Sequence, residues 1–412
     1  MVESNIPANR DELIYDWNDV GGAAKPAGRV MVTDETLRDG LQSPSVKNPS
    51  IEQKIELVEL MAKIGVYKAD VGLTGASAHQ KEHVHQILKH VHDNKLDIKI
   101  GSAGRTVIAD IEGMVEVSQK VGAPLQADLF LGCSPIRQYT EGWDLAKLMG
   151  VAKEAIEFAH SNGLTIMFVT EDTTRGKPSD VEALYKQAID LGVEAICLSD
   201  TVGHATPQGT ANLVKFCRKI CVDAGRPEVV IDWHGHNDRG LAIANCLAAL
   251  EAGADRVHGT ALGVGERVGN AMIDQIFVNL KLLGWIDNDL SSLREFCEKA
   301  SEYCDVPIPY NYPVMGRDAF ETGTGVHAAA VIKAMRKGDN WLADRVYSSV
   351  PAADFGREQT IRVGPMAGRS NIIWWLEKHG FEPTDARVDA IFEAVKKTHR
   401  LLEDDELKAL VS

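Results

Sequence analysis

Residues 194–236 read EAICLSDTVGHATPQGTANLVKFCRKICVDAGRPEVVIDWHGH and hold two short apolar runs separated by a long amphipathic segment. The runs EAICLSD and VVIDWHGH have the composition of buried strands, and residues 207–222 have the apolar spacing of a helix. A strand, a helix and a second strand in this order form a parallel β-α-β unit. The stretch therefore predicts a parallel sheet whose strands are joined by covering helices.

The same pattern occurs eight times between residues 30 and 284. The strand-like runs are RVMVTD, KADVGL, IKIGSA, LQADLFLG, LTIMFVT, EAICLSD, VVIDWHGH and RVHGT, with helical patterns at 51–64, 180–191, 207–222 and 240–252. Eight such units in about 250 residues match a (β/α)8 TIM barrel. The rival α/β fold, a doubly wound sheet, needs a GxGxxG turn after its first strand, where this chain has DETLRDGLQSP. We therefore predict a TIM barrel.

Three regions are predicted along the chain. Residues 1–28 are polar and interrupted by glycine and proline, which suits an N-terminal arm or surface cover. Residues 29–285 form the barrel domain. Residues 286–412 form a mostly helical C-terminal subdomain, with helical patterns at 292–303, 370–378 and 387–402.

The composition argues against two classes of partner. The chain has 412 residues and a net charge of −15, and an acidic surface repels the phosphate backbone of nucleic acid. No stretch approaches the about 18 apolar residues that a membrane span needs. Because the N-terminus lacks a signal-peptide pattern and the seven cysteines include no CxxC pair, we expect a cytoplasmic enzyme with reduced thiols.

Candidate functional residues gather where the predicted strands end. In a TIM barrel the catalytic groups come from the carboxyl ends of the strands and from the loops that follow them. The positions that meet this condition are Arg38, Asp39, Gln42, Arg105, Glu171, Asp172, Asp200, Thr201, His234, His236, Glu266 and Asn270. Their charged and metal-binding side chains predict an active site at this end of the barrel.

Two histidines of this set are one residue apart in the seventh strand. Residues i and i+2 of a strand point to the same side, so His234 and His236 would project together into the barrel mouth. Asp39 would lie close because the barrel closes on itself, and Asn270 could complete the set. Such oxygen and nitrogen ligands with open positions suit catalytic Mg²⁺, Mn²⁺, Zn²⁺ or Co²⁺. By spacing alone, the pair could equally be two solvated histidines in a polar turn.

Other motifs have simpler interpretations. Residues 79–92, HQKEHVHQILKHVH, spread their histidines over several faces of a helix, which predicts a solvated surface. Cys217 and Cys221 share a helix face, as packed side chains do. Arg105 and Glu266 could be salt-bridge partners at the barrel rim.

Three long motifs resemble those of metal-dependent barrel enzymes that make or break carbon–carbon bonds beside acyl-CoA groups. DETLRDGLQSP resembles the first-strand motif of that family, SDTVGHATP its sixth, and HGHNDRGLAIANCLAALEAGADRVHGTALGVGERVGNA its seventh and eighth. The family includes 2-isopropylmalate, homocitrate and citramalate synthases and hydroxymethylglutaryl-CoA lyase. The resemblance implies that Asp39, His234, His236 and Asn270 hold a divalent metal and that Arg38 lies against the substrate oxyanion.

The motifs also bear on the choice between synthase and lyase. The lyases carry a reactive cysteine in the loop after the eighth strand, where this chain has GVGERVGN, whereas Leu41 of RDGLQ replaces a glutamate usual in synthases. TGTGVHAAAVIKA and YSSVPAADFGR resemble C-terminal synthase segments that the simple lyase lacks. The resemblance implies that His327 acts in a neighbouring subunit's barrel, in a homodimer, and that Tyr347 assists it. A capped-loop histidine and a packed tyrosine are the structural alternatives.

The resemblance implies a Claisen-type condensation of acetyl-CoA with a 2-oxo acid, which yields a 2-alkylmalate-type product and CoA. The 2-oxo acid would bind the metal, and Arg38 would stabilise the developing alkoxide. His327, with Tyr347 and Glu171, is the candidate base. We expect an enzyme similar to 2-isopropylmalate synthase, which acts in leucine biosynthesis. Homocitrate synthase, citramalate synthase, a carbon–carbon lyase and a non-catalytic scaffold are the alternatives.

Substrate choice is expected to depend on less usual positions. Candidate substrate ligands are Gln42, Arg105, Asp128, Val169 and Thr201. Asp128 stands where the family often has histidine and Val169 where it often has serine, and an acid at 128 would oppose a distal substrate carboxylate. A neutral 2-oxo acid side chain is therefore expected. The regulatory domain of many isopropylmalate synthases is not expected here, nor is feedback inhibition through it.

Overall fold

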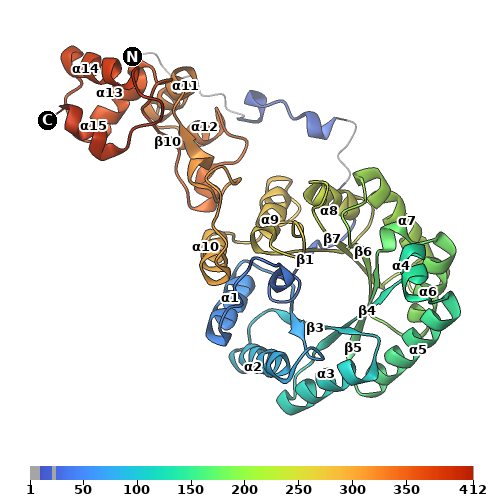
Figure 1. Cartoon of the computed structure of the whole chain (residues 1–412). Helices are drawn as coiled ribbons and strands as arrows, with labels where there is room; N and C mark the ends of the chain where they lie inside the picture. The colour runs from blue at the N-terminus through green and yellow to red at the C-terminus, as the bar shows by residue number, and fades with distance from the viewer. Residues whose placement is uncertain (1–9, 21–24, 412) are drawn as a thin grey trace. The chain divides into compact units, whose positions relative to one another are not determined.

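The computed structural model describes residues 10–20 and 25–411 and divides the chain into two compact units (Figure 1). One unit comprises Gly22–Pro307 and contains the barrel. The other combines Met1–Gly21 with Ile308–Ser412 and is built mainly from C-terminal helices.

Eight parallel strands form a closed barrel, so the predicted TIM barrel is confirmed (Figure 1). The first strand pairs with both the second and the eighth, which places Thr33 beside Lys68 on one side and His258 on the other. Each strand coincides with one of the apolar runs of the sequence. The strands are β1 (Met31–Asp34), β2 (Lys68–Leu73), β3 (Lys99–Arg105), β4 (Gln126–Gly132), β5 (Thr165–Glu171), β6 (Ala195–Asp200), β7 (Val230–Gly235) and β8 (Arg256–Gly259).

Helices join the strands and cover the outside of the barrel. Local sequence sets several of their ends: Ser50 and Gln53 form a capping box at the start of α1, and Gly122 ends α3 with a φ of 74°. The helices of this unit are α1 (Ile51–Lys63), α2 (Ala78–Asn94), α3 (Ile108–Val121), α4 (Pro135–Glu141), α5 (Leu145–Ser161), α6 (Pro178–Asp190), α7 (Pro207–Asp223), α8 (Ala242–Glu251), α9 (Ile273–Leu282) and α10 (Leu293–Cys304).

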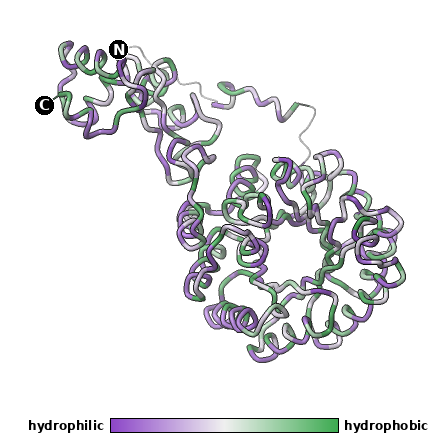
Figure 2. Tube along the Cα trace, in the orientation of Figure 1, coloured by the Kyte–Doolittle hydropathy of each residue, from purple (hydrophilic) through white to green (hydrophobic). Residues whose placement is uncertain are grey.

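The histidine-rich helix α2 is a largely hydrophilic segment of the outer ring (Figure 2). His79 and His92 are exposed, as the solvated-surface prediction requires. For His83 that prediction is wrong, because this residue lies on the apolar face with Val84 and Ile87. Its Nδ1 lies 3.2 Å from the buried Lys54 Nζ. Among the described residues, α2 forms no cluster of potential metal ligands.

Ion pairs occupy the barrel interior. Lys68 Nζ donates to the two carboxylate oxygens of Asp128 at 3.0 and 2.8 Å, and Arg256 donates from Nε and Nη2 to Asp232 at 2.5 and 2.7 Å. Met167 Sδ lies between the pairs, 3.7 Å from Lys68 Nζ and 3.9 Å from Arg256 Nη2. All five side chains are buried, and we call them the ion-pair layer. Removing one member of a buried pair typically costs about 3–5 kcal/mol of stability.

The barrel unit extends beyond residue 285, where the sequence pattern placed its end. The apolar face of α10 packs against α1, and Lys47 N donates to Cys304 O at 2.8 Å. Tyr303 Oη also donates to Glu56 of α1. Because these contacts attach α10 to the barrel, the division falls after Pro307.

Among its described residues, the second unit combines five α-helices with a short parallel sheet. An apolar cluster that includes Val363, Ile372 and Trp375 forms part of its core. The helix expected at 387–402 ends earlier, at Val395, because the chain turns back so that Leu402 N donates to Val363 O at 2.9 Å. The elements are β9 (Glu321–Thr322), β10 (Thr360–Ile361), α11 (Gly325–Arg336), α12 (Asn340–Arg345), α13 (Arg369–Lys378), α14 (Asp385–Val395) and α15 (Asp404–Val411).

Part of the predicted N-terminal arm belongs to this second unit. The short helix η1 (Arg10–Leu13) contacts α12: Arg10 Nη2 lies 3.4 Å from Asp339 Oδ1, and its guanidinium lies 5.1 Å from the centre of the Trp341 ring. Residues 1–9 and 21–24 of the predicted arm lie outside the described residues. In the part of the chain that the structure describes, no helix has the length and apolar character of a membrane span.

Candidate active site

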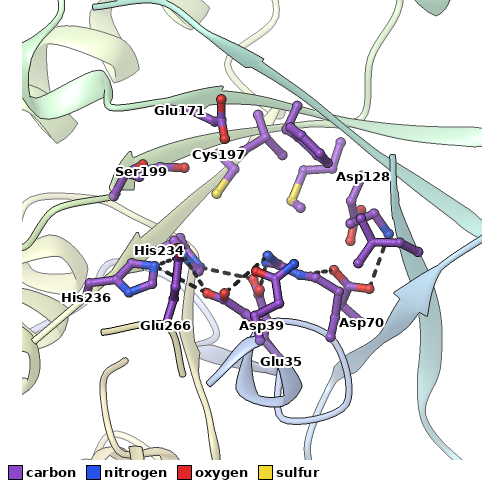
Figure 3. Close-up of a pocket in the computed structure, with 18 residues that line it drawn as sticks. Glu35, Asp39, Asp70, Asp128, Glu171, Cys197, Ser199, His234, His236 and Glu266 are labelled. Atoms are coloured by element: carbon purple, nitrogen blue, oxygen red, sulfur yellow. Dashed lines mark hydrogen bonds and ion pairs between the residues drawn. The ribbon is translucent and has the colours of Figure 1, made fainter. Parts of the chain in front are cut away.

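The carboxyl ends of the barrel strands enclose a cavity of about 230 Å³ (Figure 3). Most of the residues predicted at the strand ends line this cavity; the exceptions are Arg105, Asp172, Asp200 and Asn270. The charged and polar lining consists of Glu35, Arg38, Asp39, Gln42, Asp70, Asp128, Glu171, Ser199, Thr201, His234, His236 and Glu266. The cavity is thus surrounded by more carboxylates than cationic groups.

Asp39, His234 and His236 each bring one ligand atom to a common point. Asp39 Oδ2 lies 3.4 Å from His234 Nε2 and 3.3 Å from His236 Nε2, and the two nitrogens are 3.3 Å apart. All three side chains are buried. Burial favours a higher pKa for Asp39, but Arg38 and the two imidazoles hold that pKa well below its usual range. The carboxylate is therefore ionised and competent to bind a cation.

A divalent ion fits this triangle of ligand atoms. Ligands about 2.1 Å from an ion lie roughly 3.0–3.4 Å apart when the angles between them are 90° to 109°. The three observed separations fall in that range. Among the described residues, Asp39, His234 and His236 are one of two clusters of potential metal ligands, and the other, Glu35 with His234 and His258, shares His234.

Asn270 lies beside the triangle although it does not line the cavity. Its Nδ2 donates to Asp39 Oδ2 at 2.7 Å, and its buried Oδ1 has no partner within the described parts of the chain. Because the two ends of an amide have the same shape, exchanging them would turn Oδ1 toward the triangle as a further ligand. Asn270 is positioned by a backbone bridge to His236. A Cβ at Gly265 would come within 2.3 Å of Oδ1, so the loop needs glycine there.

Glu35 connects this triangle to the barrel interior. Its Oε1 lies 3.1 Å from His234 Nδ1 and 2.5 Å from His258 Nδ1, and His258 Nε2 lies 2.8 Å from Asp232 Oδ1. Burial lowers the pKa of His258 to about 4, although the hydrogen bond and the charge of Asp232 oppose this shift. A proton that His234 Nδ1 donates to Glu35 leaves Nε2 free to bind an ion, the usual arrangement of a histidine ligand. The sequence reasoning missed Glu35 and His258.

Arg38 is fixed by three carboxylates. Its Nε donates to Asp70 Oδ2 at 3.0 Å, its Nη1 lies 3.6 Å from Asp39 Oδ1, and its Nη2 pairs with Glu35. Burial opposes a high pKa for Arg38, but Asp39 and Asp70 raise the pKa above its ordinary value. A permanently cationic, immobile guanidinium at the cavity wall is suited to stabilise a developing oxyanion.

Glu171 lies across the cavity from Asp39 (Figure 3). Burial raises the pKa of Glu171, against the opposing effects of Arg137 and Arg38, and the side chain remains 33% exposed. Arg137 Nη2 lies 3.8 Å from Glu171 Oε2. A carboxyl group with a raised pKa at the edge of a cavity can exchange a proton with a bound molecule.

The cavity wall contributed by β2 to β5 combines apolar side chains with Asp128. Leu73, Ala103, Phe130 and Val169 form the apolar part. Asp128 lines the cavity, as the sequence reasoning assumed, but it is paired with the buried Lys68 of the ion-pair layer. That reasoning missed Lys68, because KADVGL has the appearance of an ordinary strand.

Arg105 does not line the cavity. Its side chain is 62% exposed and donates from Nε and Nη2 to Asp110 at 2.9 and 2.8 Å. A salt bridge at the barrel rim is the alternative role that the sequence allows for Arg105. Such a bridge forms because Asp110, at the start of α3, faces the end of β3. Thr201 does line the cavity, and its Oγ1 accepts a hydrogen bond from Asp172 N at 2.9 Å.

His327 and Tyr347 belong to the second unit. Their rings stack on each other, with centroids 4.3 Å apart and planes inclined by 29°. His327 lies in the first turn of α11 and is exposed, and Tyr347 is 49% exposed. The structure therefore brings the two predicted C-terminal residues together on the surface of one unit.

A closed TIM barrel with a candidate cation site, a fixed guanidinium and a titratable carboxyl group at the carboxyl ends of its strands has the features of a metal-dependent enzyme. Residues 29–299 match the model of the HMGL-like family. The chain belongs to the HMGL-like family.

Similar proteins include synthases that align over most of the chain. A probable 2-isopropylmalate synthase of Methanopyrus kandleri is 33% identical over 372 residues, which are 90% of this chain and 70% of that protein. A homocitrate synthase of the same organism is 30% identical over 371 residues, which are 89% of this chain and 87% of that protein. A putative (R)-citramalate synthase of this organism is 28% identical over 377 residues, 91% of this chain and 70% of that protein.

Solved structures with the same barrel include two lyases. The hydroxymethylglutaryl-CoA lyase of Pseudomonas aeruginosa matches 68% of this chain and 94% of its own with a TM-score of 0.57 and 19% identity. The HMG-CoA lyase of Brucella melitensis matches 67% of this chain and 99% of its own with a TM-score of 0.56 and 19% identity. At this identity the likeness concerns the fold.

Proposed function

We propose that the protein is a metal-dependent condensing synthase that joins the methyl carbon of acetyl-CoA to the keto carbon of a 2-oxo acid, after which water hydrolyses the thioester and CoA is released. The observation that carries the proposal is the triangle of Asp39, His234 and His236 beside the fixed Arg38. The synthase relatives support it, because their alignments cover 89% and 90% of this chain and therefore extend into the second unit. The lyase structures cover 67% and 68%.

Each group of residues in the cavity would have its own role in the reaction. A divalent ion held by Asp39, His234, His236 and Asn270 would act as a Lewis acid on the keto group of the 2-oxo acid. Arg38 would donate hydrogen bonds to the oxygen that becomes negatively charged. Gln42 and Thr201 would orient the substrate as lining residues.

Glu171, His327 and Tyr347 are the proposed acid–base groups. Deprotonation of the acetyl methyl group requires a base, and an exposed imidazole is a side chain that can accept a proton. Because His327 belongs to the second unit, we propose that it completes the barrel site of a neighbouring subunit in a homodimer. The cytoplasmic location also stays a prediction.

The proposed 2-oxo acid has an uncharged side chain. Leu73, Phe130 and Val169 offer apolar contacts, and the acids around the cavity oppose a second substrate carboxylate. Lys68 offsets the charge of Asp128, so the remaining carboxylates carry most of this preference. An enzyme similar to 2-isopropylmalate synthase fits these walls better than a homocitrate synthase, and a citramalate synthase acting on pyruvate is the nearer alternative.

Release of CoA thiol from acetyl-CoA tests this proposal directly. The purified chain is mixed with acetyl-CoA and 2-oxoisovalerate, pyruvate or 2-oxoglutarate, with added divalent metal or with chelator. We expect release with the first substrate above the other two, and none with chelator. Background from the protein should be low, because all seven cysteines are free but buried and burial raises the pKa of Cys133 to about 12. Preferred turnover of 2-oxoglutarate would contradict the substrate assignment.

A lyase would behave differently in a second assay. It would cleave a 3-hydroxyacyl-CoA in a metal-dependent reaction and would show no condensation. Cleavage of 3-hydroxy-3-methylglutaryl-CoA without CoA release from acetyl-CoA and any 2-oxo acid would replace the synthase proposal. If the protein catalyses neither reaction at any metal concentration, a non-catalytic barrel would be favoured.

A further inference from the structure

The amino-terminal end of the barrel contains a second cavity of about 820 Å³. It lies between the first residues of several strands and the C-terminal half of α2, within the barrel unit. The proposed condensation does not use it, because the reacting groups gather at the other ends of the strands. A volume of this size is in the range of small-molecule binding sites.

One side of this second cavity is apolar. Leu88 and Val91 of α2 line it together with Leu96 and Ile98 from the segment that leads into β3. Ala195 at the start of β6 adds to the same lining. These side chains offer an aliphatic surface on which the body of a ligand can be removed from water.

Cations dominate the charged part of the lining. Arg256 is buried and uses Nε and Nη2 to bind Asp232, whereas its Nη1 makes no hydrogen bond within the described parts of the chain. Lys99 Nζ lies 2.5 Å from Tyr67 Oη at the edge of the cavity. Lys99 Nζ and the Arg256 guanidinium lie 4.6 and 5.5 Å from the centre of the same Tyr67 ring, so the two cations are suited to bind one carboxylate.

The acids of the lining are already engaged. Asp93 pairs with Lys89, and Glu194 Oε2 accepts a hydrogen bond from Ile166 N at 2.6 Å. The lining holds four cationic side chains, Lys68, Lys95, Lys99 and Arg256, and two acidic ones, Asp93 and Glu194. Lys68 and Arg256 are balanced by Asp128 and Asp232. The preference of the cavity for an anion therefore depends on Lys95 and Lys99, which have no salt-bridge partner among the described residues, and on the Nη1 of Arg256.

We propose that the second cavity binds a medium-chain alkyl carboxylate, with its carboxylate at Arg256 and Lys99 and its alkyl chain along Leu88, Val91 and Ile98. The occupant would lie directly beneath the catalytic cavity. Met167 lines that cavity and contacts both Lys68 and Arg256, which line the second one. The ion-pair layer is thus the separation between the two sites.

Calorimetric titration of the full chain with octanoate tests the binding. It needs neither metal nor substrate, so its result is independent of the proposed condensation. We expect saturable binding of octanoate, with octanamide and butyrate each weaker by roughly tenfold or more, because one lacks the charge and the other most of the apolar contact. Equal binding of octanamide, or no saturation by octanoate, would overturn the proposal. Displacement of octanoate by equimolar inorganic phosphate would also overturn it, since the site would then select any anion.

Two variants locate the site. Lys99→Glu reverses a charge at the edge, and Val91→Trp fills the apolar side, so each should weaken octanoate binding by roughly tenfold or more. Lys153→Glu on α5 and Val222→Trp on α7, at exposed positions outside the cavity, are the matched controls and should bind as the unmodified chain does. Circular dichroism and thermal unfolding check that all four variants fold. Unchanged binding by both folded cavity variants would place the ligand elsewhere and refute the assignment.

Discussion

Replacing Glu35 with glutamine isolates the contribution of a residue that touches a proposed metal ligand without binding the metal itself. Glu35 Oε1 accepts from the Nδ1 side of both His234 and His258, and Oε2 pairs with Arg38. Glutamine keeps the shape but replaces one acceptor oxygen with a donor. Three donors would then share a single acceptor oxygen, and one histidine must lose its bond or move its proton to Nε2.

The expected loss of metal affinity follows from that tautomer change. A protonated His234 Nε2 cannot bind a cation, so the ion would have to shift the proton back before binding. Removing such an outer carboxylate typically lowers metal affinity by about 10- to 100-fold, which corresponds to about 1.4–2.7 kcal/mol. Because Glu35 is 2% exposed and water cannot replace it, we expect a value near the upper end.

Competition between the metal-free protein and a chromophoric chelator for Zn²⁺ or Mn²⁺ measures this effect without any substrate. Glu266→Gln is the matched control, because Glu266 lines the same cavity but is 57% exposed and pairs with Arg267 at 3.4 Å. Its affinity should change by no more than about threefold. If Glu35→Gln binds metal as tightly as the control, the proposed orienting role of Glu35 is wrong.

Three further outcomes are expected. Burial raises the pKa of Asp34 to about 7, against the opposing bonds from Thr36, so its folded-state proton is retained where the unfolded chain has lost it. The free energy of unfolding should therefore fall by on the order of 4 kcal/mol as pH rises from 3.8, the ordinary pKa of an aspartate, toward 7. Urea titrations of Asp34→Asn across this pH range should show a much smaller fall. The same pH dependence in the variant and the unmodified chain would contradict this prediction. Lys68→Met should lose about 3–5 kcal/mol of stability, and adding Asp128→Leu should recover most of it, whereas an additive further loss would refute a paired layer. His327→Ala should abolish CoA release while metal affinity stays unchanged, with Lys333→Ala on the same helix as the active control; retained turnover would remove His327 from the mechanism.

The barrel could be predicted because each strand carries its own signal. Runs such as LTIMFVT and EAICLSD hold unbroken apolar stretches, IMFV and AICL, as strands buried on both faces do. The C-terminal boundaries could not be predicted in this way. The amphipathic pattern of α10 requires a partner but does not identify α1, and the pattern at 387–402 does not show that Leu402 must return to Val363.

The candidate metal ligands could also be predicted from the sequence. The HxH spacing and the order of strands in a closed barrel bring Asp39, His234 and His236 together without knowledge of any other side chain. Glu35 and His258 were missed because the contacts that join them to each other and Glu35 to His234 span 223 and 199 residues of sequence, although the alternation of each strand places both toward the interior. Lys68 was missed for the same reason, since its meaning depends on Asp128 of a different strand.

The ion-pair layer has a consequence for how relatives of this protein diverge. Loss of Lys68 alone would leave the buried charge of Asp128 unpaired, and loss of Arg256 alone would leave that of Asp232 unpaired. Exchanging both members for apolar side chains of similar volume is often neutral or stabilising. Positions 68 and 128, and positions 232 and 256, should therefore covary among homologous sequences, so that the barrel interior changes two residues at a time while its apolar wall positions change singly.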